Sequence, residues 1–429
     1  MLGDAPKWGF NWWGIGGPNL SPARKTSQIV GQQRQFTIHF GIMIERELTP
    51  PDRSFFLFGP RQTGKSTWLN QLDLGPTWTV NLLQSETYYR YLRDPSQFRR
   101  EALEKVASGI TWIVLDEVQK LPALLDEVHG LLESTSVKFI LSGSSARKLK
   151  RGGANLLGGR ALRRAMHPFT VQELGLQFDL ETALQWGTLP PLLGLSSTDR
   201  KDTLVSYVEL YLREEIQLEG LVRNLGGFTR FLDFAASYCG EILNYSSVAK
   251  EAGLPIKTVQ SYFEVLEDTL IALRLPAWTK SPLKRLVSHP KVYLFDNGVT
   301  NALTHRLNGA LDPSVRGRLF EQFLVQETVR RMDYSQADSA LWYWRTNNGA
   351  EVDLLVELEG RLVAAVEFKS RPSISGADLS GLRSFHGDYP EVPCYLVCTA
   401  PERFQLDFVQ VLPWRMYLES LLGSLLKES

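Results

Sequence analysis

Residues 54–67 read Ser-Phe-Phe-Leu-Phe-Gly-Pro-Arg-Gln-Thr-Gly-Lys-Ser-Thr, and this stretch decides the fold. An apolar run, Phe55 to Phe58, leads into the pattern G-x-x-x-x-G-K-S from Gly59 to Ser66. The helix-forming sequence Thr67-Trp-Leu-Asn-Gln-Leu follows. A strand, a glycine-containing loop and a helix in this order are the context in which such a pattern forms a phosphate-binding loop, or P-loop. The stretch therefore predicts an α/β fold built on a parallel sheet.

The residue types of this loop suit a nucleoside triphosphate. Gly59 and Gly64 let the backbone curl so that its N–H groups point at phosphate oxygens, and the following helix adds its positive end. Lys65 can reach the β- and γ-phosphates, while the Ser66 hydroxyl is placed to ligate Mg²⁺. We expect ATP and Mg²⁺ as ligands. The predicted nucleotide-binding residues are Gly59, Pro60, Arg61, Gln62, Thr63, Gly64, Lys65, Ser66 and Thr67.

A second part of the same site is expected in Trp112-Ile-Val-Leu-Asp-Glu, an apolar run that ends in two acids. A buried parallel strand has this composition, and ligands gather at the carboxyl ends of such strands. An acid pair after a strand is common on surfaces by itself. Together with the P-loop, however, the pair predicts that Asp116 holds Mg²⁺ and that Glu117 activates the attacking water.

The next strand-like run is Val137-Lys-Phe-Ile-Leu-Ser-Gly-Ser-Ser. In P-loop ATPases of the additional-strand class, the strand inserted beside the acidic one ends in a polar sensor of the γ-phosphate. Ser142 or Ser144 takes that place here, and Ser144 is the predicted catalytic residue.

From Gly143 to Thr170 the chain has seven basic residues and no acidic one. Leu-Leu-Gly-Gly-Arg160, at the centre of this stretch, resembles the position where such enzymes keep an arginine that touches the γ-phosphate. We therefore predict a catalytic role for Arg160, beside Lys65 and Glu117. The other six are interpreted as a solvated basic loop: Arg147, Lys148, Lys150, Arg151, Arg163 and Arg164.

Four motifs in succession resemble a prokaryotic family of AAA+-like P-loop ATPases. They are Gly-Pro-Arg-Gln-Thr-Gly-Lys-Ser, Val-Leu-Asp-Glu-Val-Gln-Lys, Leu-Ser-Gly-Ser-Ser-Ala and Gly-Gly-Arg-Ala, followed by His-Pro-Phe-Thr-Val-Gln-Glu-Leu. The C-terminal half of that family is a domain of unknown function, DUF4143. The resemblance covers about residue 43 to the end. It implies ATP hydrolysis and a helical lid after the ATPase core, and oligomers are possible because AAA+-like sites often borrow an arginine from a neighbour.

A helix-turn-helix pattern begins near Tyr245. Ser246 is expected to cap its first helix and Gly253 to form the turn, and Leu270-Ile-Ala-Leu-Arg-Leu resembles the strand of a winged helix. Between Glu241 and Arg285 there are six basic and five acidic residues, less basic than a DNA-binding module should be. A packing role and a DNA-binding role therefore both stay open. The second helix is predicted to bury Val259, Phe263 and Leu266, and to hold Lys257, Thr258 and Gln260 within reach of a groove.

The C-terminal part carries four residues in the order of the E…D…E-x-K pattern of the PD-(D/E)XK nuclease fold. Strand alternation puts Val352, Leu354 and Val356 on one face and Asp353 on the other. A hairpin of the two strands then brings Asp353 near the E-x-K pair, beside a glutamate on an upstream helix. Carboxylates suit Mg²⁺, and a lysine can stabilise an attacking hydroxide. The alternative is an ion pair on a solvated sheet face, and nuclease activity is left open. The four residues are Glu321, Asp353, Glu367 and Lys369.

Length and composition set the frame for these motifs. A chain of 429 residues is expected to form two or three domains, and its formal net charge of zero argues against a generally polycationic nucleic-acid binder. Three cysteines without a C-x-x-C pair fit a reducing cytoplasm, and no apolar run approaches the ~18 residues that cross a membrane. The predicted parts are a disordered tail (1–42, with Met43 as an alternative start), a P-loop ATPase core (43–171), a helical lid (172–236), a winged helix-turn-helix (237–285) and a PD-(D/E)XK-like domain (286–429).

The leading hypothesis is a cytoplasmic, Mg²⁺-dependent AAA+-like ATPase that is coupled to DNA through its winged-helix and nuclease-like parts. The alternative is an ATP-driven switch or sensor that binds a protein partner and carries an inactive nuclease-like domain. The sequence names neither the DNA form nor the protein partner.

Overall fold

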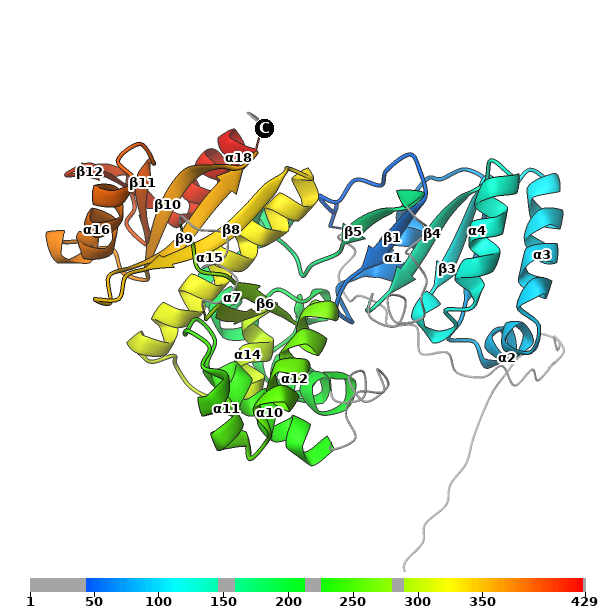
Figure 1. The fold of residues 1–429 in the computed structure, drawn as a ribbon, viewed down its shortest axis with the longest axis horizontal. Coiled ribbons are helices and arrows are strands. Elements are labelled where there is room, and N and C mark those ends of the chain that lie inside the picture. The colour runs from blue at the N-terminus through cyan, green and yellow to red at the C-terminus, as the bar shows by residue number, and fades with distance from the viewer. Residues whose placement is uncertain (1–43, 146–158, 213–224, 280–288, 427–429) are drawn as a thin grey trace, which may run out of the picture. The chain divides into compact units, whose positions relative to one another are not determined.

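The computed structural model describes residues 44–145, 159–212, 225–279 and 289–426. The predicted tail and the basic residues Arg147, Lys148, Lys150 and Arg151 lie outside these ranges. The first sheet has five parallel strands, which confirms the predicted α/β fold (Figure 1). In spatial order they are β2 (Thr77–Asn81), β3 (Trp112–Asp116), β4 (Lys138–Gly143), β1 (Phe55–Phe58) and β5 (Leu162–Ala165).

Strand β1 is buried along its whole length because helices cover both faces of this sheet. Phe56 and Phe58 point into a core shared with α3 and α4, whereas Phe55 and Leu57 pack with Trp68 on the opposite face. Such a strand reads as a continuous apolar run rather than as an alternation. The helices of this part are α1 (Lys65–Gln71), α2 (Ser85–Arg93), α3 (Pro95–Ala107) and α4 (Leu124–Ser134), with a 3-10 turn at Val118–Lys120.

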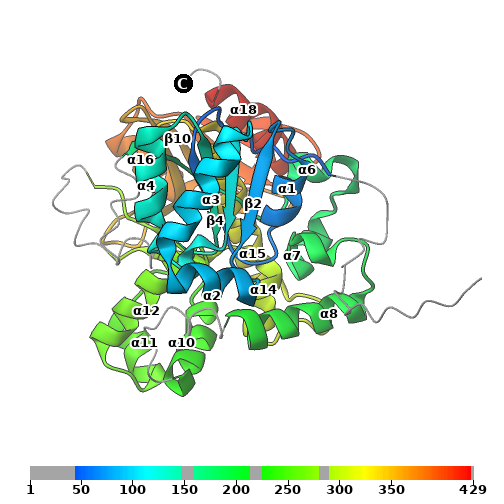
Figure 2. The same cartoon turned by 90° about the vertical axis from the view of Figure 1, so that its right-hand side faces the viewer.

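The middle of the chain is mainly helical, as predicted. One hydrophobic cluster joins residues from Leu189 to Leu307, so that the helices before and after the helix-turn-helix share its core. In both views α10, α11 and α12 lie together (Figures 1 and 2). The helices are α6 (Val171–Leu174), α7 (Leu180–Trp186), α8 (Ser197–Ser206), a π-helical turn at Tyr207–Leu212, α10 (Leu225–Ser237), α11 (Tyr245–Ala252), α12 (Ile256–Asp268) and α14 (Asn297–Leu303), with 3-10 turns at Gly175–Gln177 and Pro190–Leu192.

The expected pair of helices is present as α11 and α12, joined by Gly253 with a φ of 66°. The predicted core residues Val259, Phe263 and Leu266 are buried. The predicted cap is wrong: Asn244, not Ser246, accepts the backbone N–H groups of residues 246 and 247, because the helix begins two residues earlier than a cap at Ser246 implies. The strand that follows is β6 (Ala272–Leu275), which pairs antiparallel with β7 (Lys291–Leu294).

The C-terminal part holds a second sheet between two layers of helices. One face packs on α15 and the C-terminal helices, and the other packs on α16. In spatial order the strands are β12 (Phe404–Leu406), β13 (Val409–Pro413), β11 (Cys394–Cys398), β10 (Arg361–Lys369), β9 (Glu351–Leu358) and β8 (Ser339–Arg345). The helices are α15 (Pro313–Ser335), α16 (Ser380–Asp388), α17 (Trp414–Met416) and α18 (Leu422–Leu425), with a 3-10 turn at Gly376–Leu379 and a π-helical turn at Tyr417–Leu421.

The antiparallel hairpin of β9 and β10 forms as predicted, but the alternation along β9 is interrupted. Trp342 pairs with Leu355 and Trp344 pairs with Val352, so two residues of β9, Asp353 and Leu354, lie opposite one residue of β8. Val352 consequently packs on the α16 side rather than with Leu354, which corrects the predicted face. A bulge of this kind re-aims a side chain, and here that side chain is Asp353.

Candidate functional site

The P-loop lies between β1 and α1, at the carboxyl edge of the first sheet. A Cβ atom at Gly59 would lie 2.3 Å from the carbonyl oxygen of Met166, so only glycine fits there. Gln62 and Gly64 have φ values of 64° and 93°, in the left-handed region that tightens the loop. Thr63 is fully buried and donates its hydroxyl to the Pro60 carbonyl at 2.9 Å. The loop is therefore fixed by its own backbone and is shaped to surround an anion.

Lys65 is buried beneath this loop. Its Nζ donates to the carbonyl oxygens of Gly59 at 2.7 Å and Pro60 at 3.0 Å. An ammonium group held inside the loop by these contacts is in place to meet phosphate oxygens. Lys65 thus lies where the sequence pattern predicts it.

The predicted Mg²⁺ ligands Ser66 and Asp116 lie side by side. The Ser66 hydroxyl donates to one Asp116 oxygen at 3.4 Å, and Ser142 donates to the other. Asp116 is buried, and both residues line a cavity of about 250 Å³. A hydroxyl and a carboxylate beside a phosphate-binding loop are a suitable donor set for Mg²⁺, so the residues present fit this ion.

Glu117, the predicted base, is held next to these groups by a residue that was not predicted. Gln119 donates to the Glu117 carboxylate at 2.6 Å and to the Ser144 hydroxyl at 3.1 Å. Burial raises the pKa of Glu117 above its ordinary value, although nearby Lys65 opposes the shift. Glu117 also has a φ of 63°, a conformation that a non-glycine residue keeps only where the surroundings enforce it. Ser144 is therefore linked to Glu117, whereas Ser142 is linked to Asp116.

Arg160 does not lie at the P-loop of its own chain. Leu162 pairs with Phe55 at the start of β1, while the P-loop follows Phe58 at the other end, about 10 Å further along the strand. Arg160 is exposed and donates to Glu133 near the end of α4 at 2.8 Å. The prediction that Arg160 contacts the γ-phosphate is therefore wrong within a single chain. Arg160 comes just before β5, which runs parallel to β1, so it lies at the amino edge of the sheet, opposite the P-loop.

A buried arginine, Arg46, ties the P-loop to more distant parts of the chain. Its guanidinium donates to the carbonyl oxygens of Thr63 at 2.9 Å and His167 at 2.6 Å, and to Glu173 at 2.9 Å. The same group contacts the hydroxyl of Tyr334, near the end of α15, at 3.1 Å. The Arg46 and Glu173 side chains are 4% and 0% exposed, so this pair is sheltered from water. Arg46 thus links the nucleotide loop directly to helix α15.

The four residues of the predicted nuclease-like site lie together in the C-terminal part, in a largely buried cluster of charged side chains that we term the acidic pocket. Lys369 donates to Glu367 at 2.6 Å, and the backbone N–H of Phe368 donates to Asp353 at 2.9 Å. Burial, together with the neighbouring charge of Asp353, raises the pKa of Glu321 to about 7 and that of Glu367 to about 8. The Oε2 atom of Glu367 is buried without a hydrogen-bond partner. The carboxyl groups therefore lie close enough to oppose one another's ionisation, as the sequence pattern indicates.

A lysine that was not predicted lies within this acidic pocket. Lys291 of β7 places its Nζ 2.9 Å from Glu321, 2.6 Å from Glu351 and 3.3 Å from Asp353. In the part of the chain that the structure describes, no group of three His, Cys, Asp or Glu side chains is arranged to hold a metal ion. The residues present therefore do not fit the divalent cation that the nuclease pattern implies.

Three functional side chains escaped sequence reasoning. Gln119 belongs to the quoted motif Val-Leu-Asp-Glu-Val-Gln-Lys, so its closeness to Glu117 was a usable signal. Arg46 belongs to Met-Ile-Glu-Arg-Glu-Leu, which looks like an ordinary charged helix start. Lys291 is the first residue of the otherwise apolar strand β7 and carries no local signal, because its partners lie 30 or more residues away.

The fold and the first site are those of a P-loop nucleotide-binding protein with an additional strand. Residues 51–175 match the family model of the AAA domain, and residues 316–417 match the domain of unknown function DUF4143. The resemblance inferred from the motifs is thereby confirmed: the chain carries an AAA domain followed by a DUF4143 domain. Residues 177–309, between them, match a further domain of unknown function, DUF8612.

Two relatives match about three quarters of the chain. Uncharacterized proteins of Mycobacterium tuberculosis and Mycobacterium bovis are each 28% identical over 337 residues, which cover 76% of this chain and 73% of theirs. Among solved structures, the Orc1 protein of Aeropyrum pernix in complex with DNA matches with a TM-score of 0.25 and 14% identity over 60% of this chain and 87% of its own. The replication initiator DnaA bound to AMPPCP and single-stranded DNA matches with a TM-score of 0.25 and 15% identity over 50% and 82%. TM-scores this low support no argument.

Among the described residues, no helix is both long and apolar enough to cross a membrane.

Replacing Arg46 with methionine should destabilise the protein by about 3–5 kcal/mol, because Glu173 is then left buried and without its cation. Urea denaturation followed by tryptophan fluorescence measures the change. The matched control is Arg100→Met, which breaks an exposed pair with Asp94 and should cost less than about 1 kcal/mol. Equal effects of the two substitutions would show that the Arg46 contacts carry no special weight.

Proposed function

We propose that the protein hydrolyses ATP in the presence of Mg²⁺. The observation that carries this proposal is the convergence of Lys65, Ser66, Asp116 and Glu117 at one edge of the parallel sheet. Glu117 is near enough to Lys65 and Asp116 for both charges to act on its pKa. A binding loop alone would need only the lysine and the serine. The added pair of acids supports hydrolysis rather than binding alone.

Each residue has a distinct task in this proposal. The loop N–H groups and Lys65 bind the phosphates, and Ser66 and Asp116 hold the ion. A bound Mg²⁺ neutralises charge as it develops on the β- and γ-phosphates. Glu117 orients a water for in-line attack and accepts its proton, since a carboxylate of raised pKa is the better base. Gln119 positions Glu117 relative to Ser144, next to the end of β4.

The Arg46 contacts support a conformational role for the ATP. Thr63 of the P-loop and Tyr334 of α15 share the same guanidinium. Glu321, in the acidic pocket, lies on the same helix, about 20 Å from Tyr334 at the rise of an α-helix. A change in the loop on binding or hydrolysis can thus act on α15 and, through it, on the C-terminal domain.

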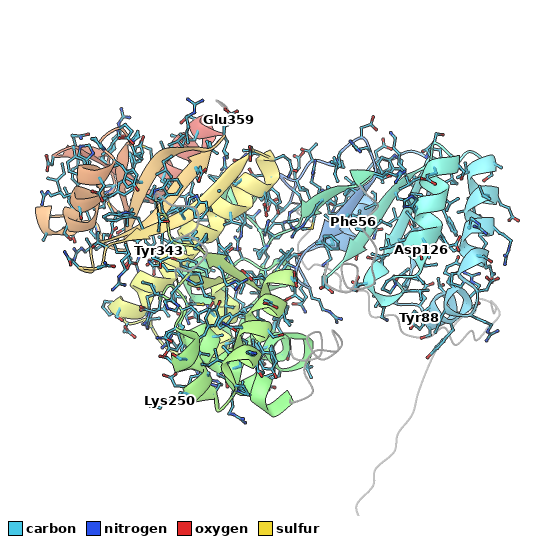
Figure 3. The ribbon with its side chains drawn as sticks, viewed as in Figure 1. Phe56, Tyr88, Asp126, Lys250, Tyr343 and Glu359 are labelled. Carbon is cyan, nitrogen blue, oxygen red and sulfur yellow. The ribbon has the colours of Figure 1, made fainter. Side chains whose placement is uncertain are left out.

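DNA is the partner that we propose for the helix-turn-helix. Lys250 of α11 is exposed (Figure 3), as are Lys257 and Gln260 of α12, and Thr258 is partly exposed. Lys257 and Thr258 lie in the first turn of α12, where a recognition helix presents its side chains to a groove. Because residues 241–285 carry nearly equal numbers of basic and acidic side chains, we expect their binding to DNA to be weak and sensitive to salt.

A second candidate is an ATP-driven switch that acts on a protein partner and whose nuclease-like domain does not cut. The position of Lys291 among Glu321, Glu351 and Asp353 favours a non-cutting domain. The two candidates share the ATPase and differ in the partner.

Glu117→Gln should retain ATP binding while its rate of hydrolysis falls by roughly 10²–10⁴, because an amide cannot accept the proton. Fluorescence titration with an ATP analogue measures binding, and phosphate release measures hydrolysis. Glu86→Gln, which alters an exposed acid on α2, is the matched control and should leave both unchanged. A Glu117→Gln variant with the wild-type rate of phosphate release would refute the proposed hydrolysis.

We further propose that Arg160 completes the site of a neighbouring copy, since it lies away from its own P-loop. Arg160→Ala and Glu117→Gln should each be inactive alone. Mixed in equal amounts, they should recover about a quarter of the wild-type phosphate release, because a quarter of sites then combine an intact Glu117 with a neighbour's intact Arg160. The exposed neighbour Arg163, changed to alanine, serves as the control. A mixture as inactive as its components would exclude an arginine supplied in trans.

The double variant Lys250→Glu/Lys257→Glu should bind a DNA duplex more weakly and with a salt slope smaller by about 2, one unit for each lost phosphate contact. Fluorescence anisotropy at several salt concentrations measures both quantities. Arg93→Glu/Lys105→Glu changes two exposed cations on α2 and α3 and should alter neither. Identical binding by wild type and the α11–α12 variant would remove the DNA role and favour the protein-partner candidate.

A further inference from the structure

The acidic pocket of the C-terminal domain receives its cation from outside that domain's own sheet. Lys291 belongs to β7, which pairs with β6 after the helix-turn-helix. Along β7, Val292 and Leu294 point into the core of the middle part, whereas Tyr293 packs with the C-terminal core. Strand alternation puts Lys291 on the same side as Tyr293. The strand thus presents a lysine and a tyrosine to the pocket while its other face is anchored elsewhere.

Three carboxylates surround the ammonium group of Lys291. Its Nζ donates to Glu321 at 2.9 Å and to Asp353 at 3.3 Å, and it lies 2.6 Å from an oxygen of Glu351. The side chain is 3% exposed. Tyr293 adds a hydrogen bond to Glu321 at 2.7 Å. The ring of Tyr343 (labelled in Figure 3) has its centre 5.9 Å from the lysine nitrogen, within reach of a cation–π interaction.

Without the lysine, this pocket would have a strong demand for another cation. Four carboxylates belong to this pocket: Glu321, Glu351, Asp353 and Glu367. Lys369 forms an ion pair with one oxygen of Glu367. One Glu367 oxygen, buried without a hydrogen-bond partner, adds an unsatisfied acceptor. Oxygen ligands of this kind suit a hard divalent ion. Lys291 Nζ instead lies within 3.3 Å of oxygens of Glu321, Glu351 and Asp353, where such an ion would take its ligands.

We propose that Lys291 acts as a built-in cation that occupies the acidic pocket and closes it to divalent metal ions. The pocket then keeps the residue set of a metal-dependent nuclease but holds an ammonium group where the metal would be required. This inference is independent of ATP hydrolysis, because it concerns a pocket that the ATP site does not touch.

The test compares Mn²⁺ binding by the wild-type pocket and by Lys291→Met. All proteins carry Asp116→Asn and are kept free of nucleotide, so that the ATP site contributes no metal binding. Free Mn²⁺ is measured by electron paramagnetic resonance during titration. The Lys291→Met variant should bind one Mn²⁺ at least tenfold more tightly than the wild-type pocket. Thermal unfolding should show the same preference: Mn²⁺ should raise the melting temperature of Lys291→Met only.

Two control variants decide whether a gain arises in this pocket. Lys369→Met removes the other lysine but leaves Lys291 in place, so it should gain no Mn²⁺ site. Lys291→Met/Asp353→Asn should lose the gained site, because a carboxylate is missing. A Lys369→Met variant that gains the same site would overturn the proposal.

A folded Lys291→Met variant that binds no more Mn²⁺ than wild type would also overturn the proposal. Should Lys291→Met fail to fold, Lys291→Gln retains an amide donor for these acids and leaves every carboxylate in place. Circular dichroism establishes that the variant is folded. The same tenfold gain in Mn²⁺ affinity is expected, and its absence counts against the proposal.

Discussion

The buried guanidinium of Arg46 is the interaction on which the rest of the structure depends. A planar group with five donors can serve several acceptors at once, and here they belong to the P-loop, the segment after β5, α6 and α15. Because Glu173 beneath it is fully shielded from water, neither charge can be removed without leaving the other unpaired. The nucleotide loop and α15 are consequently fixed relative to each other by a contact that neither makes alone.

Parallel strand direction explains which of the predicted catalytic residues lie together in the structure and which one lies apart. The P-loop after β1, Asp116 and Glu117 at the end of β3, and Ser144 after β4 all follow carboxyl ends, which meet at one edge of the sheet. Arg160 precedes β5 and therefore lies at the other edge. Whether a residue comes before or after its parallel strand decides which edge of the sheet it occupies, and therefore which residues can share one site. Closeness in sequence to a motif does not decide this.

The two lysines of the acidic pocket differ in how far along the chain their partners lie. Lys369 was predictable because it lies two residues from Glu367, and the two side chains do form an ion pair. Lys291 contacts three carboxylates, yet it comes from β7, which pairs with β6 outside the sheet that carries Asp353 and Glu367. A bulge in β9 also sets the direction of Asp353, which strict alternation alone did not foresee.

The sequence by itself determined the P-loop, the acidic strand end and the α/β class, because each depends on residues that are neighbours along the chain. It also determined the order of carboxylates and lysine in the C-terminal part. Only the tertiary structure decided that Arg46 joins the P-loop to α15 and that Gln119 holds Glu117. It likewise placed Lys291 inside the acidic pocket. The physical reason is that these contacts depend on burial and on pairing between residues far apart in the sequence. A local sequence pattern encodes neither of them.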